Sequence, residues 1–130
     1  MSRIVLIEDD ANSARLASRL LARAGHAVEV AVDGGDGLTL IAAHPPELVL
    51  VDLGLPDVDG QTVIAMLRQT SAMQQVPIVV FTAWPQETAQ AMMTAYGCDG
   101  LIVKPIDTRT FVDQVNRYLL VRDDGHVEKL

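Results

Sequence analysis

The feature that most constrains the fold of this chain is a regular alternation of short apolar runs with segments of helical period. Most runs are continuously apolar and rich in Val, Ile and Leu, as strands buried on both faces of a sheet are. The predicted strands are 4–7, 27–32, 48–51, 76–81 and 101–103. The intervening segments place apolar residues on one helical face, and the predicted helices are 12–24, 36–43, 61–69, 86–96 and 108–120.

This order of elements is that of a (βα)5 chain. Strands joined by helical crossovers pair in parallel through right-handed connections, so helices cover both faces of one twisted sheet. The sequence therefore predicts an α/β fold with a doubly wound, five-stranded parallel sheet. The predicted domain covers residues 1–121, and residues 122–130 form a polar C-terminal tail that is too short for a second domain.

Charge and composition exclude several classes of protein. The formal net charge is −7 and no segment concentrates Lys or Arg, so direct binding to nucleic acid is not expected. No stretch is apolar for long enough to span a membrane, and the N-terminus lacks the features of a signal peptide. Cys98 is the single cysteine, so no internal disulfide can form, which agrees with the cytoplasmic location that we expect.

Polar residues follow four of the predicted strands at their carboxyl ends, where parallel α/β sheets bind ligands. Ionised carboxylates that are held close together repel one another unless a cation lies among them. All the candidate ligands are oxygens, which indicates a hard cation, with Mg²⁺ ahead of Mn²⁺ or Ca²⁺. The residues that follow the first strand are Glu8, Asp9 and Asp10, and Asp52 follows the third. The fourth strand leads into Thr82 and Ala83, and the fifth leads into Lys104.

The other polar groups suit phosphoryl chemistry. Asp is a known covalent phosphoryl acceptor, and a metal ion beside it screens the approach of an anionic donor. Lys104 can pair with a phosphoryl oxygen, and Thr82 can donate a hydrogen bond to another. The sequence thus favours Asp52 as a nucleophile that forms an acyl phosphate.

The segments RIVLIEDD, LVLVDLGLPDVDG, VPIVVFTA and GLIVKP resemble the four signature segments of response-regulator receiver domains. The similarity covers residues 3–121, and the motifs occur in order at the ends of the expected strands. The resemblance implies a flavodoxin-like fold with strand order 2-1-3-4-5. It also implies a phosphorylated Asp52.

The resemblance further implies how the ligands are shared. Asp9, Asp52 and the backbone carbonyl of Gly54 are expected to bind Mg²⁺ directly, with Glu8 acting through a water molecule. Asp10 is ranked third among the acids that follow the first strand, because the family's acid pair aligns with Glu8 and Asp9.

Around the phosphoryl group, the resemblance assigns the oxygens to Thr82, to the backbone amide of Ala83 and to Lys104. The peptide bond from Lys104 to Pro105 is cis in this family. These residues complete the expected site.

As a receiver, the chain is expected to take its phosphoryl group from a histidine kinase or a histidine phosphotransfer protein of a two-component system or phosphorelay. It assists its own phosphorylation and dephosphorylation and is not an enzyme in the usual sense. The fourth helix, fifth strand and fifth helix form the family's usual partner surface, and we expect a monomer or a weak dimer. An alternative is that the chain is the N-terminal receiver of a larger regulator.

One position departs from the family pattern. The family couples Thr82 to an aromatic side chain three residues before the lysine, and that residue is Leu101 here. We therefore expect the fourth helix and its preceding loop to carry the response. Trp84 lies two residues past Thr82 and is expected to report on the site.

Two other classes share parts of this pattern. A phosphohydrolase with an aspartyl-phosphate intermediate needs a second acid two residues after its nucleophile, where this chain has Gly54. A flavodoxin-like cofactor binder needs a Gly, Ser and Thr cradle after the first strand, where Glu8, Asp9 and Asp10 would repel a phosphate. The sequence disfavours both.

Overall fold

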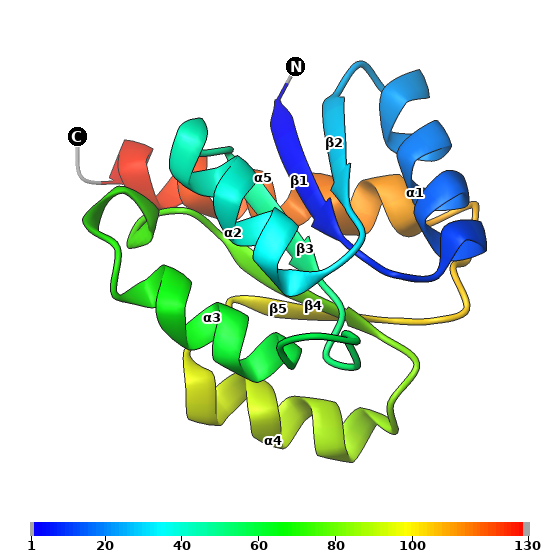
Figure 1. Cartoon of the computed structure of the whole chain (residues 1–130). Coiled ribbons are helices and arrows are strands. Elements are labelled where there is room, and N and C mark those ends of the chain that lie inside the picture. Colours follow the sequence, from blue (N-terminus) through cyan, green and yellow to red (C-terminus); the bar gives the residue numbers. More distant parts are fainter. Residues whose placement is uncertain (1, 129–130) are drawn as a thin grey trace.

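The computed structural model describes residues 2–128, in which five strands alternate with five α-helices (Figure 1). The side chains of residues 2–119 are described. In chain order the elements are β1 (Arg3–Ile7), α1 (Ala11–Arg23), β2 (Ala27–Ala31), α2 (Gly34–Ala43), β3 (Leu48–Val51), α3 (Gly60–Arg68), the 3-10 turn η1 (Ser71–Met73), β4 (Ile78–Thr82), α4 (Gln86–Tyr96), β5 (Gly100–Val103) and α5 (Phe111–Glu128).

The strands form one parallel sheet in the order β2-β1-β3-β4-β5. This arrangement confirms the predicted fold class and strand order. Ile7 at the end of β1 pairs with Ala31 of β2 and with Val51 of β3, so the carboxyl ends of these strands lie level. The residues that follow Ile7 and Val51 are therefore neighbours.

Two apolar clusters pack the helices onto the two faces of the sheet. Alternate strand residues point to opposite faces, so Val5 and Ile7 join one cluster while Ile4 and Leu6 join the other. The first cluster lies under α2, α3 and α4, and the second lies under α1 and α5. Burial on both faces explains why the strands are continuously apolar.

Several boundaries differ from the predicted ones. Strand β4 starts at Ile78 and not at residue 76, because Pro77 has no N–H to donate to a neighbouring strand. Helix α5 starts at Phe111 and extends to Glu128, whereas the prediction ended it at residue 120. The apolar period stops near Leu120, but no proline follows to end the helix. The domain boundary at residue 121 stays a prediction.

Carboxylates begin three of the helices. Asp10, Asp33 and Asp59 each accept a hydrogen bond from the backbone N–H three residues on, which satisfies a free donor of α1, α2 and α3. Gly97 ends α4 with a φ of 77°, a left-handed conformation that favours glycine. Within the described part of the chain, no helix combines the length and the apolar character that a bilayer crossing requires.

Candidate functional site

Three carboxylates meet at the carboxyl ends of β1 and β3. Glu8 and Asp9 follow β1, and Asp52 follows β3, where its backbone N–H donates to the carbonyl of Ile7 at 3.0 Å. One oxygen of each acid lies within 4.8 Å of the others. Glu8 and Asp52 are buried, while Asp9 is exposed. The cluster can hold one hard cation with one side open to solvent.

Lys104 brings a positive charge to these acids from the end of β5. Its ammonium pairs with Oε1 of Glu8 and lies 3.3 Å from Oδ2 of Asp52. It also lies 5.0 Å from the centroid of the Phe81 ring, a distance at which cation and ring attract. The Lys104–Pro105 bond is cis, as the resemblance implied. The ammonium therefore touches acids from two other strands.

Burial and charge oppose each other in this cluster. Burial raises the pKa of Glu8 to about 7, against the lowering effect of its contact with Lys104. Burial also acts to lower the pKa of Lys104, but the carboxylates of Glu8 and Asp52 outweigh it and raise that pKa above its ordinary value. Lys104 thus remains protonated at neutral pH.

The end of β4 supplies the hydroxyl of Thr82, and Ala83 follows it. The Thr82 side chain is fully buried, and its Oγ accepts a hydrogen bond from the N–H of Trp84 at 3.2 Å. This contact leaves the hydroxyl proton of Thr82 available to donate. The backbone carbonyl of Thr82 accepts a hydrogen bond from the N–H of Lys104 at 2.9 Å, which joins the ends of β4 and β5. Ala83 follows on the exposed surface.

Two glycines keep the backbone of the next loop close to Asp52. The N–H of Gly54 donates to Oδ1 of Asp52 at 3.3 Å, and Gly54 is exposed. A Cβ added to Gly60 would lie 2.3 Å from the backbone carbonyl oxygen of Asp52, so a side chain there has no room. A Cβ on Gly54 would lie 3.5 Å from Nε1 of Trp84, so the indole borders the same loop.

Asp10 lies outside the group of three acids. Its side chain caps α1 by accepting from the N–H of Ser13 at 3.1 Å and from the Ser13 hydroxyl at 2.7 Å. These hydrogen bonds hold the pKa of Asp10 below its usual value. Its own N–H donates to Oε2 of Glu8 at 3.2 Å, so Asp10 supports the cluster through its backbone.

One further acid beside the site joins two segments of the chain. Asp57, in the loop after β3, accepts hydrogen bonds from the N–H groups of Gly34 at 2.8 Å and Gly35 at 2.9 Å, at the start of α2. The contact crosses between distant segments, and no local pattern signals it.

Comparison with known proteins places this fold and site in a family. The response regulator receiver domain matches residues 4–116. The DNA-binding dual master transcriptional regulator RpaA of Synechocystis sp. is 37% identical over 124 residues, which are 95% of this chain and 51% of RpaA. Protein PilH of Pseudomonas aeruginosa is 28% identical over 92% of this chain and 98% of PilH. The chain thus spans about half the length of RpaA and nearly all of PilH.

A solved structure shares the same fold. The chemotaxis response regulator CheY4 of Vibrio cholerae superposes with a TM-score of 0.86 at 24% identity, covering 91% of this chain and 98% of that one. Fold and site together define a doubly wound α/β domain with a carboxylate cluster beside a lysine. The chain belongs to the response regulator receiver family of two-component systems. Receiver domains are signalling domains that bind Mg²⁺ at an acidic cluster, and Glu8, Asp9 and Asp52 lie close together here.

Proposed function

We propose that this protein is a phosphoacceptor whose Asp52 is phosphorylated in a Mg²⁺-dependent reaction. The observation that carries the proposal is the position of Lys104, whose ammonium pairs with Glu8 and lies 3.3 Å from Asp52 in a cluster of three acids. An acid that only stabilised the fold would have no need of two further acids at its side. The arrangement instead suits a carboxylate that must meet an anionic donor.

The residues fit a magnesium ion. The three acids offer oxygens alone, within 4.8 Å of one another, and the single ammonium of Lys104 balances only part of their negative charge, which favours a bound cation. We propose Asp9, Asp52 and the backbone carbonyl of Gly54 as ligands, with Glu8 acting through water and Asp10 ranked behind them. Mn²⁺ is the alternative cation. When bound, the ion supplies charge stabilisation for the transferring phosphoryl group.

The transfer step uses groups of this chain. A carboxylate oxygen of Asp52 attacks the phosphorus of a phosphohistidine, the new P–O bond forms as the P–N bond breaks, and the imidazole leaves with the electron pair. The ammonium of Lys104 lies 3.3 Å from Oδ2 of Asp52. It can therefore move from this carboxylate to an oxygen of a phosphoryl group bound to Asp52. The hydroxyl of Thr82 and the amide of Ala83 donate to the remaining oxygens.

The donor that we propose is a histidine kinase or a histidine phosphotransfer protein. A downstream protein then binds the face formed by α4, β5 and α5, and the chain acts as a monomer or a weak dimer in the cytoplasm. Cys98 is the single cysteine, so the chain forms no internal disulfide, which is compatible with a reducing compartment. RpaA is about twice as long as the matched chain, which supports the alternative of an N-terminal receiver joined to an output domain.

A phosphohydrolase is the rival from an enzyme class. Gly54 stands where that class needs a second acid, and it has no side chain for proton transfer. Asp9 is the exposed acid of the cluster, but we assign it to the proposed metal site and not to proton transfer. We therefore propose transfer to Asp52 without turnover of many phosphate esters.

The test is incubation with acetyl phosphate, with and without Mg²⁺, followed by intact mass measurement. We expect one phosphoryl group per chain, only with Mg²⁺, and none in Asp52→Asn. Asp113→Asn, which removes an exposed acid of α5, is the matched control and should behave as the parent. An adduct that persists in Asp52→Asn, or release of free phosphate over many turnovers, would contradict the proposal.

A further inference from the structure

Strand β5 leaves one side of its backbone without a partner strand, because it is the last strand of the sheet. The N–H of Lys104 points inward and donates to Thr82 of β4. Backbone groups of successive residues point to opposite sides of a strand, so those of Leu101 and Val103 point outward. An outward edge of this kind is a template for pairing with another strand.

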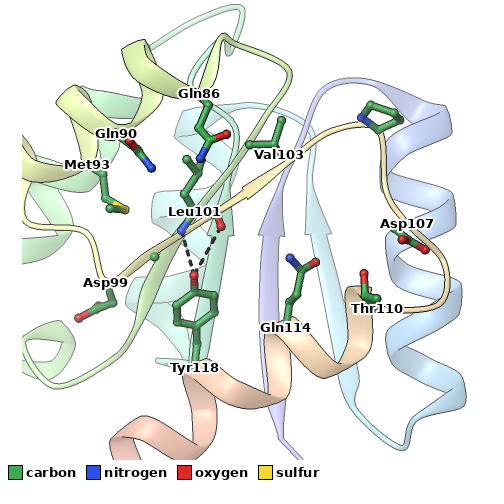
Figure 2. A pocket seen from close by; sticks show the side chains of 12 residues that line it. Gln86, Gln90, Met93, Asp99, Leu101, Val103, Asp107, Thr110, Gln114 and Tyr118 are labelled. Carbon is green, nitrogen blue, oxygen red and sulfur yellow. Dashed lines mark hydrogen bonds between the residues drawn. The ribbon is translucent and has the colours of Figure 1, made fainter.

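The outward groups of Leu101 are bound by a side chain from α5. The hydroxyl of Tyr118 accepts a hydrogen bond from the N–H of Leu101 at 3.2 Å and donates one to its carbonyl at 3.4 Å. Figure 2 shows the Tyr118 ring rising from α5 to meet this part of β5. One phenol can make both bonds because it carries a proton and free lone pairs. A single oxygen thus closes both outward groups of this residue.

Gly100 makes this contact possible. A Cβ at this position would lie 2.1 Å from Cε1 and Cζ of the Tyr118 ring, so any side chain would displace the ring. Tyr118 packs against the apolar cluster under α1 and α5, and its ring reaches past Gly100 to the sheet edge. Glycine at 100 and tyrosine at 118 therefore act as a pair.

With Leu101 closed, Val103 is left as the outward residue of β5 to which no side chain among residues 2–119 forms a hydrogen bond. Pro105 soon follows and has no N–H, and the N–H of Asp99 before β5 donates to Ile78. The edge also borders an open pocket of about 440 Å³, lined by Gln86, Gln90, Met93, Leu101, Gln114 and Tyr118 (Figure 2). Because the pocket is open, another chain could approach this edge of β5. The hydroxyl of Tyr118 occupies the backbone groups that such a chain would need.

We propose that Tyr118 closes the outer edge of β5 against strand addition, and that the partner it excludes is the same edge of a second copy. Two identical edges can pair about a two-fold axis, and every copy presents this edge. Pairing between two strands needs backbone hydrogen bonds from more than one outward residue. Because Tyr118 occupies the backbone groups of Leu101, Val103 alone is too little for such pairing. This role goes beyond the proposed phosphoacceptor function and holds in the unphosphorylated protein.

Amide hydrogen exchange of the whole chain tests the contact. Tyr118→Phe keeps the ring and removes the hydroxyl, so at a concentration low enough to keep the variant monomeric, exchange at the Leu101 amide should become about tenfold faster. Amides of β1 and β3 should exchange as in the parent, which shows that the fold is intact. Tyr96→Phe is the matched control, because it removes an exposed hydroxyl from α4 and should leave Leu101 unchanged. Unchanged exchange at Leu101 in Tyr118→Phe would overturn the proposal.

Sedimentation of the same variants tests the exclusion of a second copy. At equal concentration, Tyr118→Phe should have a higher average mass than the parent. Gly100→Ala should act likewise, because its methyl group displaces the Tyr118 ring. Val103→Lys, added to Tyr118→Phe, should restore the parent's mass by placing a charge at the edge. Faster exchange at Leu101 without a rise in mass, or a rise that Val103→Lys does not reverse, would contradict the role in exclusion.

Discussion

The ammonium of Lys104 lies 3.3 Å from Oδ2 of Asp52, although β4 separates the strands β5 and β3 that these residues follow. The same ammonium pairs with Glu8, so one cation joins residues that follow β1, β3 and β5. A phosphoryl group on Asp52 would therefore compete with Glu8 for the lysine.

Lys104→Met removes the cation and keeps much of the side chain's length. We expect phosphorylation by acetyl phosphate to slow by about 100-fold or more, because a charged donor to the transferring group is lost. Time courses of the mass adduct give the rate. Arg109→Met is the control, because it removes an exposed positive charge outside the cluster. Equal rates in Lys104→Met and the parent would exclude a role for this ammonium in the transfer.

Glu8 should make magnesium binding depend on pH near neutrality. Burial raises the pKa of Glu8 to about 7, so in the metal-free protein its carboxyl gains a proton as the pH falls through 7. A cation must displace that proton, so the affinity for Mg²⁺ should fall between pH 8 and pH 6. Calorimetric titration at several pH values measures the affinity. Glu8→Gln should flatten this dependence, and an equally steep curve in that variant would assign it elsewhere.

The same group should affect stability without metal. The pKa of Glu8 in the folded protein lies above its ordinary value of 4.5, so folding takes up a proton between these two values. The contribution of Glu8 to the free energy of unfolding should therefore fall as the pH rises from about 4.5 to about 7, and then level off. Urea unfolding in EDTA, compared with Glu8→Gln, isolates this contribution. A rise across this window that is specific to the parent would contradict the assignment.

Gly60 should tolerate no side chain. In Gly60→Ala the new methyl group would lie 2.3 Å from the carbonyl oxygen of Asp52, which forces the backbone apart. We expect a loss of about 1 to 3 kcal/mol in the free energy of unfolding, with weaker Mg²⁺ binding. Gly35→Ala is the control, because its methyl group would meet its nearest neighbour at 3.4 Å. Equal stability of the two variants would show that the loop relaxes freely.

Trp84 should report on the site in place of an aromatic residue at position 101. The indole Nε1 of Trp84 lies next to Gly54, and the backbone N–H of Trp84 donates to the Thr82 hydroxyl. Changes at Asp52 can therefore affect Trp84 through two neighbouring residues. Since it is the single tryptophan, its fluorescence should change when Mg²⁺ or a fluoride mimic of the phosphoryl group is added. Asp52→Asn should reduce the response. No change with either ligand bound would exclude Trp84 as a reporter.

Local patterns in the sequence predict much of this structure. Continuous apolar runs mark buried strands, and acids after two of them predict that Glu8, Asp9 and Asp52 meet, because parallel strands end at one edge of the sheet. The contacts that remained hidden join distant segments. Asp57 caps the start of α2, and the position of Asp57 in a turn gives no sign of that partner.

Tyr118 and Gly100 illustrate the same limit. Helical spacing places Tyr118 on α5, but its contact with β5 depends on how helix and strand cross, which the local sequence does not encode. Gly100 has an ordinary place at the start of a strand, and only the ring beside it explains the missing side chain. The ring of His26 likewise forms a hydrogen bond with the side chain of Asn116 at 2.8 Å, a contact between segments that are distant in the sequence.

Asp52 itself should carry the phosphoryl group, and chemical trapping tests this most directly. Borohydride reduces an acyl phosphate of aspartate to homoserine, which peptide mass mapping locates in the chain. After phosphorylation with Mg²⁺, we expect homoserine at position 52 and at no other acid. Homoserine at Asp9 or another aspartate in place of position 52 would contradict this assignment, and so would 2-amino-5-hydroxyvaleric acid, the reduced product of a glutamyl phosphate, at Glu8.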